Sequence, residues 1–131
     1  MKRSEYFRLG VVVAVLSVAA FAGCSNDGLD RVGISGRVTF EGKPLEGAEV
    51  SFRPEYGPNA GGLTDADGVY LIDKSFGPVS GKCEVRVAKM AIPEGSSYVT
   101  NILPGEFQNK PMIVKFDDRQ NTLDIDLDTW D

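Results

Sequence analysis

Apolar and polar residues alternate along most of the chain after residue 31, and a period of two is typical of half-buried β-strands. Glycine, proline, asparagine and aspartate gather between the alternating segments, where they indicate turns. No segment after residue 31 has convincing helical periodicity, and the stretch 90–111 is expected to be irregular. The predicted strands are residues 32–40, 48–52, 62–64, 69–73, 81–87, 112–116 and 123–127.

Many short strands joined by turns predict an all-β fold, and the pattern favours a seven-stranded antiparallel β-sandwich. We place this single domain at residues 32–128. About 100 residues can bury one modest hydrophobic core without disulfide bonds. The domain is therefore expected to be stable without covalent crosslinks.

The first 23 residues have the pattern of a signal peptide. Lys2, Arg3 and Arg8 form a basic segment, and the apolar run 9–22 that follows ends in small residues. A membrane-spanning helix is the alternative, but it needs about 20 apolar residues and this run is shorter. We therefore predict an export signal that is removed.

The segment Phe21-Ala22-Gly23-Cys24 resembles the lipobox of bacterial lipoproteins, in which a small residue precedes a cysteine that becomes acylated. Phe21 stands where that pattern usually has an aliphatic residue. The resemblance implies a lipid anchor on Cys24, with residues 24–31 as the acylated cysteine and its tether. Two or three acyl chains, palmitate among them, would hold the chain stably at a cell-envelope membrane, on the outer membrane or on a periplasmic face. A secreted protein with an incidental cysteine is the alternative.

The charge of the chain is acidic. Its 14 Lys and Arg against 19 Asp and Glu give a formal net charge of −5, and removal of residues 1–23 would take away three basic residues and one acidic one. Nucleic acid is an unfavourable partner for such a chain, since phosphates are bound by clustered Lys and Arg. The chain has no histidine, which excludes Ser-His-Asp, Cys-His and His-metal sites.

Asp65, Asp67 and Gly68 invite comparison with a calcium loop. Such a loop needs six to eight oxygen ligands, usually including a bidentate Glu, and no Glu follows Gly68 within a dozen residues. A hairpin turn closed by aspartate side chains explains these residues better. We predict no metal and no cofactor.

Cys83 is in phase with Val85 and Val87 on its predicted strand. This phase predicts a buried, inert thiol.

Longer motifs resemble the carboxypeptidase-regulatory-like (transthyretin-like) domains of lipoproteins of planctomycete type. The resemblance implies a transthyretin-like (prealbumin-like) Greek-key sandwich and a family of mostly accessory envelope proteins. The matching segments, which span essentially the whole mature chain, are 36–48 (GRVTFEGKPLEGA), Val50-x-Phe52-x-Pro54, 64–72 (TDADGVYLI), Gly81-Lys82-x-x-Val85-x-Val87, Leu103-Pro104-x-x-Phe107 and Asn121-x-Leu123-x-Ile125-x-Leu127.

Four aromatic residues fall outside the alternation and are candidate binding residues: Tyr56, Tyr98, Phe107 and Trp130. Loop aromatics can stack on sugars or anchor a protein contact, although they often fill the ends of a sandwich core instead. We predict a non-catalytic envelope lipoprotein with a structural or protein-binding (adaptor) domain. A carbohydrate-binding module is the alternative, so the expected partner is an envelope protein or a polysaccharide.

Overall fold

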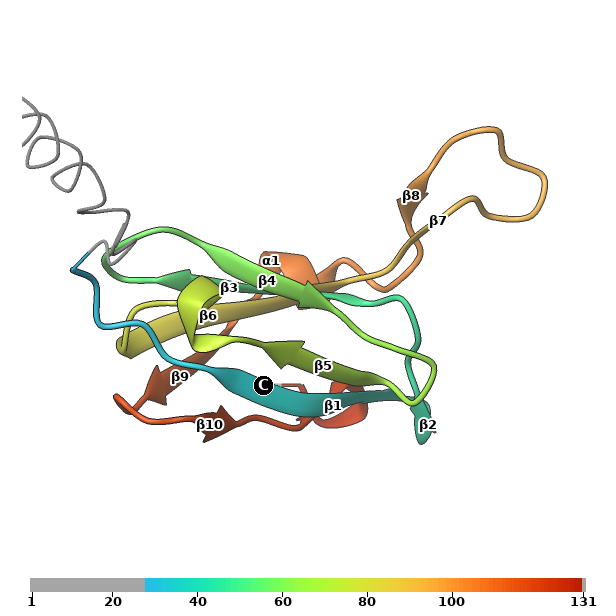
Figure 1. Cartoon of the computed structure of the whole chain (residues 1–131). Helices are drawn as coiled ribbons and strands as arrows, with labels where there is room; N and C mark the ends of the chain where they lie inside the picture. Colours follow the sequence, from blue (N-terminus) through green and yellow to red (C-terminus); the bar gives the residue numbers. More distant parts are fainter. Residues whose placement is uncertain (1–27, 131) are drawn as a thin grey trace, which may run out of the picture.

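The computed structural model describes residues 28–130, so the predicted signal peptide, Cys24 and the start of the predicted tether lie outside the described residues. Two β-sheets face each other across a hydrophobic core, as Figure 1 shows. The strands in chain order are β1 (Ile34–Phe40), β2 (Lys43–Pro44), β3 (Glu49–Pro54), β4 (Ala60–Leu63), β5 (Val69–Ile72), β6 (Gly81–Ala88), β7 (Met90–Ala91), β8 (Thr100–Asn101), β9 (Met112–Phe116), β10 (Asn121–Thr122) and β11 (Ile125–Asp126). Residues 28–130 also contain three short helices, namely η1 (Lys74–Phe76), α1 (Glu106–Asn109) and η2 (Leu127–Thr129).

The predicted all-β sandwich is confirmed, and its core follows the predicted alternation. In the sheet β4-β3-β6-β9 every neighbouring pair is antiparallel. Val50 lies opposite Val87 and Phe52 opposite Val85 in the β3–β6 register, and all four side chains are buried. Residues between them on the same strands, such as Ser51, lie outside the core. Each strand therefore buries one face, as half-buried strands do.

The Greek-key order is also present. β3, β4 and β5 are neighbours in succession, with the step from β4 to β5 crossing between the sheets, and β6 returns to pair with β3. The crossing is close, because a Cβ on Gly62 of β4 would lie 3.2 Å from Cγ1 of Ile72 on β5. A fourth strand that returns beside the first is the mark of this motif.

The structure corrects the expected strand count and the purely antiparallel pairing. Residues 28–130 form eleven strands, and the closing segment runs parallel to β1 as two pieces, β10 and β11. Between the two pieces the backbone N–H of Arg37 donates to Oδ1 of Asp124 at 3.0 Å, so a side chain takes the place of the backbone partner there. Leu127, expected in the strand, lies in η2 because Asp126 accepts the N–H of Asp128 and caps that helical turn.

The stretch 90–111, expected to be irregular, contains β7, β8 and the single turn of α1. A helix of four residues is too short to leave a periodic pattern in the sequence. β7 and β8 pair only with each other and project from the body of the sandwich (Figure 1). We call this projection, residues 89–102, the 89–102 hairpin.

The turn between β1 and β2 links the first strand to the C-terminal segment. Glu41 and Gly42 have φ values of 53° and 74°, as a two-residue type I′ hairpin turn requires. The carboxylate of Asp128 accepts their two backbone N–H groups at 3.0 and 3.1 Å. The C-terminal acidic residues therefore include at least one with a structural role.

Candidate functional site

The N-terminal side of the domain lies at the end of the sandwich where β6 begins. Arg31 forms a β-bridge with Val79, and the N–H of Ser80 donates to the carbonyl of Asp30 at 2.8 Å. The N–H of Val32 donates to the carbonyl of Pro78 at 2.9 Å. Residues 30–32 are thus held beside the segment that leads into β6.

Tyr56 lies at that same end and is 77% exposed. It follows β3, and its neighbour Glu55 donates its backbone N–H to the carbonyl of Lys82 at 3.0 Å, near the start of β6. Nothing in the described structure covers the ring, so this candidate is available for binding.

Tyr98 is 80% exposed and lies at the opposite end, on the 89–102 hairpin that follows the last residue of β6. The eight residues of β6 span about 23 Å at a rise of about 3.3 Å per residue. Tyr56 and Tyr98 therefore do not form one stacking platform, and they cannot contact the same sugar ring.

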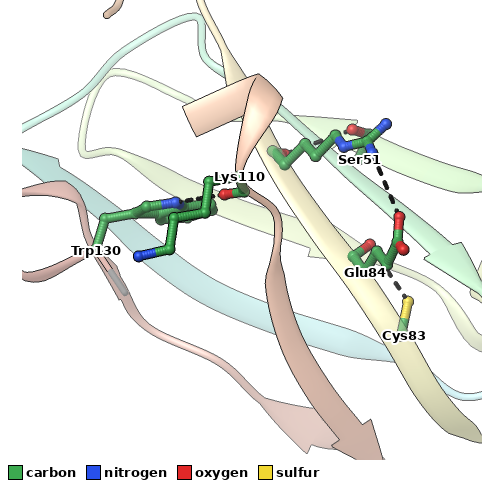
Figure 2. Close-up of polar contacts among 6 residues, drawn as sticks. Ser51, Cys83, Glu84, Lys110 and Trp130 are labelled. Atoms are coloured by element: carbon green, nitrogen blue, oxygen red, sulfur yellow. Dashed lines mark hydrogen bonds and ion pairs between the residues drawn. The ribbon is translucent and has the colours of Figure 1, made fainter. Parts of the chain in front are cut away.

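Phe107 is a core residue and Trp130 is partly buried against the core, so neither is an exposed loop aromatic. Phe107 is 2% exposed, and α1 places its ring edge-on against Phe40 and Trp130, with ring centroids 6.2 and 5.5 Å away. The indole Nε1 of Trp130 donates to the carbonyl of Lys110 at 2.8 Å (Figure 2). These two aromatics close one end of the core, which was the alternative use of loop aromatics.

The 89–102 hairpin carries apolar side chains on both faces. Met90 pairs with Asn101 and Ala91 with Thr100, so alternation places Met90 on one face and Ile102 on the other. Ile92, Tyr98 and Val99 lie beyond the paired residues, toward the tip. All five of these apolar side chains are exposed. Exposed apolar side chains of this kind make the 89–102 hairpin a candidate binding surface. No signal in residues 90–111 predicted it, because these residues alternate too briefly.

The base of the hairpin is held firmly by Asn101. Its side-chain Oδ1 accepts the backbone N–H groups of Lys89 at 3.0 Å and Leu103 at 3.2 Å. The N–H of Ile102 donates to the carbonyl of Lys89 at 2.9 Å. The projection therefore starts from a fixed point at the end of β6.

A cleft of about 410 Å³ lies at the base of α1, on the outer face of β3 and β6, and is lined in part by Glu49, Ser51, Arg86 and Gln108. The guanidinium of Arg86 pairs with Glu84 through Nη2 at 3.4 Å, and its Nε is buried. Figure 2 shows Ser51 and Glu84 on this face. Since two carboxylates accompany the one guanidinium, the cleft has no excess positive charge with which to hold an anion.

Asp65 forms the predicted turn. Its Oδ1 accepts the backbone N–H groups of Asp67 at 2.9 Å and Val69 at 3.0 Å, and Gly68 has a φ of 73°. Among residues 28–130 no group of three or more Cys, Asp or Glu is arranged to hold a metal ion. In the same part of the chain no helix has the length and apolar content needed to cross a membrane.

Cys83 is buried, as its phase with Val85 predicted, and it is the one cysteine of the described residues. Its S–H donates to the carbonyl of Glu84 at 3.7 Å (Figure 2). Burial raises the pKa of the Cys83 thiol to about 11, and the charge of Glu84 adds to the rise, against a backbone hydrogen bond from Arg53 that lowers it. A thiol with such a pKa is largely protonated at neutral pH.

We expect Cys83 in folded residues 25–131 to react with iodoacetamide at pH 8 at least about two orders of magnitude more slowly than an unperturbed thiol, because only the thiolate reacts. The rate should rise as the pH approaches 11. Stability should fall over the same range, since the unfolded thiol ionises from about pH 8.5 and the folded one does not. The same reaction in concentrated urea is the control. Equal rates in the folded and unfolded chain would contradict the burial of Cys83.

No family model matches this chain, and no curated protein matches its sequence. Two solved structures of DUF3823 family proteins are similar in fold. The one from Bacteroides ovatus has 11% identity and a TM-score of 0.44, covering 73% of this chain and 43% of that chain. The one from Parabacteroides merdae has 12% identity and a TM-score of 0.42, covering 73% and 45%. A 9R-lipoxygenase from Cyanothece matches with a TM-score of 0.34 and 20% identity, covering 71% of this chain and 16% of that chain.

This chain therefore spans less than half the length of each of these structures. No family model and no curated sequence supports the resemblance to carboxypeptidase-regulatory-like lipoproteins. The structure shows an all-β sandwich. The 89–102 hairpin is its candidate binding surface.

Proposed function

We propose that this chain is a non-catalytic lipoprotein of the bacterial envelope, related to the carboxypeptidase-regulatory-like lipoproteins that its motifs resemble. Acyl chains on Cys24 anchor it, and the 89–102 hairpin binds a protein partner. The single observation that carries this proposal is the exposure of apolar side chains on both faces of a projecting hairpin. Such a hairpin gains stability when a partner covers it, because isolated two-stranded ribbons are marginal in water.

The positions of the two ends of the domain support this division of roles. Three residues separate Cys24 from Gly28, and the four Cα–Cα steps between them reach at most about 14 Å. An anchor on Cys24 thus holds the end where β6 begins near the membrane. The 89–102 hairpin follows the other end of β6, about 23 Å further along the strand, and is available to a partner in the envelope.

The carbohydrate-binding alternative has less support. The two exposed tyrosines, Tyr56 and Tyr98, lie at opposite ends of β6, and Phe107 is buried. Sugar-binding surfaces use aromatic faces beside convergent polar groups. Neither tyrosine lines the cleft at the base of α1.

A photoreactive phenylalanine analogue in place of Tyr98 tests the proposal in cells that make the full chain. The matched control carries the analogue in place of Leu71, which is 73% exposed on β5. We expect a discrete crosslinked protein from position 98 and none from position 71. Mass spectrometry of the mature chain should show acyl groups on Cys24, and Cys24→Ala should abolish them.

Crosslinks of equal yield at both positions, or none at position 98, would contradict a role of the hairpin in protein binding. An unmodified Cys24 in the mature chain would contradict the anchor. Retention of residues 25–131 on envelope polysaccharide, lost on Tyr56→Ala or Tyr98→Ala, would favour the carbohydrate-binding alternative instead.

A further inference from the structure

The outer edge of β8 is an open hydrogen-bonding edge. The N–H of Ile102 donates to the carbonyl of Lys89, so the pair 89/102 is a hydrogen-bonded pair of the β7–β8 ladder. Hydrogen-bonded and non-hydrogen-bonded pairs alternate along an antiparallel ladder, so Thr100 also directs its backbone groups toward β7. The backbone groups of Val99 and Asn101 consequently point away from β7. Within the described residues, β8 pairs with no strand other than β7.

This edge is short, since β8 has two residues, but it lacks the side chains that usually block pairing. Native edge strands carry lysine, proline or inward charges that block another strand. Residues 95–102 (GSSYVTNI) contain no charged residue and no proline, whereas the β7 side contains Pro93 and Glu94. The segment around β8 is therefore the half of the hairpin that can accept a further strand.

The edge is complementary to itself. An antiparallel pairing centred on Thr100 places Val99 opposite Asn101 of a second copy, and these are the residues whose backbone groups point outward. The same register places Thr100 opposite Thr100 and Tyr98 opposite Ile102. Thr–Thr and aromatic–β-branched pairs are favourable cross-strand neighbours. Tyr98 and Ile102, both exposed in the single chain, would cover each other.

Charge does not oppose the same arrangement. Antiparallel pairing puts the two acidic bodies at opposite ends of the joined ribbon. Their repulsion is then weak, because exposed charges are screened beyond about 8 Å at physiological salt.

We propose that the partner of the 89–102 hairpin is a second copy of this chain, and that two copies join their β8 strands across a two-fold axis at Thr100. The four-stranded ribbon β7-β8-β8-β7 is an isologous interface, which closes as a dimer. This inference rests on the proposed protein-binding role of the hairpin and names its partner.

A disulfide at the two-fold axis tests the pairing. Non-hydrogen-bonded antiparallel partners have Cα atoms about 4.5 Å apart, which is within the range that a disulfide bridges. The described sheets and core lie wholly within residues 28–130, so residues 25–131 are the appropriate material. We expect Thr100→Cys to form a covalent dimer rapidly in air. The matched control is Thr122→Cys, on exposed Thr122 of β10, which should stay monomeric.

A second variant tests the hydrogen bonds. Val99→Pro removes the N–H that points to the open edge and leaves the bonds between β7 and β8 in place. Sedimentation equilibrium should show a concentration-dependent dimer for the unchanged domain and at least about tenfold weaker association for Val99→Pro. Leu71→Lys should dimerise like the unchanged domain.

A monomer at all concentrations, a Thr100→Cys disulfide no faster than that of Thr122→Cys, or a dimer that withstands Val99→Pro would each overturn the pairing. A crosslink from position 98 to a different protein, with residues 25–131 monomeric, would overturn this inference and leave the protein-binding role intact. Binding of monomeric residues 25–131 to vesicles of neutral phospholipid through the hairpin would overturn both.

Discussion

Gly36→Ala is expected to lower the free energy of unfolding by about 3–4 kcal/mol, or to prevent folding. Gly36 lies in the middle of β1, and the closing segment passes directly over it. A Cβ there would overlap the carbonyl oxygen of Leu123, lie 2.6 Å from the carbonyl carbon, and lie 3.0 Å from the hydroxyl of Tyr70. The atoms of Leu123 are backbone and cannot turn aside as a side chain can.

The overlap lies where hydrogen bonds join the closing segment to β1 and β5. The hydroxyl of Tyr70 donates to the same Leu123 carbonyl, and the N–H of Leu123 donates to the carbonyl of Ser35 at 2.8 Å. A methyl group at position 36 must therefore push the closing segment off β1 and break these bonds. The hydroxyl of buried Tyr70 would then lose its hydrogen bond, which adds to the cost.

Urea unfolding of residues 25–131, followed by circular dichroism, measures this effect. Ser35→Ala is the matched control, because it changes the neighbouring residue of the same strand and keeps the backbone carbonyl that accepts from Leu123. We expect the control to stay within about 0.5 kcal/mol of the unchanged domain. A Gly36→Ala domain with the same midpoint as the control would refute the close passage of the closing segment.

Phe52→Ala is expected to lower the free energy of unfolding by about 3–5 kcal/mol. Phe52 on β3 is fully buried, and its ring centroid lies 6.0 Å from that of Tyr70 on β5 and 5.8 Å from that of Phe116 on β9. The ring thus joins the two sheets at their centre. Its removal leaves a cavity between the sheets, which neighbouring side chains can fill only in part.

The same unfolding measurement provides the test, with Phe76→Ala as the matched control. Phe76 lies in η1 and is 75% exposed, so its loss should cost less than about 0.5 kcal/mol. Similar midpoints for the two variants would mean that Phe52 is not part of a well-packed core.

Much of the fold could be predicted from local pattern. The alternation around Val50 and Phe52 identified β3, and that around Cys83 and Val85 identified β6, because a strand that buries one face must alternate. The Asp65 turn was equally local, since its side chain bonds to its own next residues. In each case the physical cause lies within a few residues along the chain.

The candidate site could not be predicted in the same way. Phe107 and Tyr98 both fall in the stretch 90–111, outside any clear alternation, yet one is buried and the other is 80% exposed. Burial of Phe107 depends on Phe40 and Trp130, which approach it from distant parts of the chain. Exposure of Tyr98 depends on the hairpin projecting beyond both sheets (Figure 1).

The sequence by itself determined the fold class, the positions of the longer strands, the turn at Asp65 and the burial of Cys83, because these follow from side-chain period and local hydrogen bonding. Only the tertiary structure decided that the closing segment runs parallel to β1 in two pieces, with Asp124 bonding between them. It alone also decided which aromatics face solvent. These features depend on contacts between residues far apart along the chain, and such contacts leave no periodic pattern in the segments that make them.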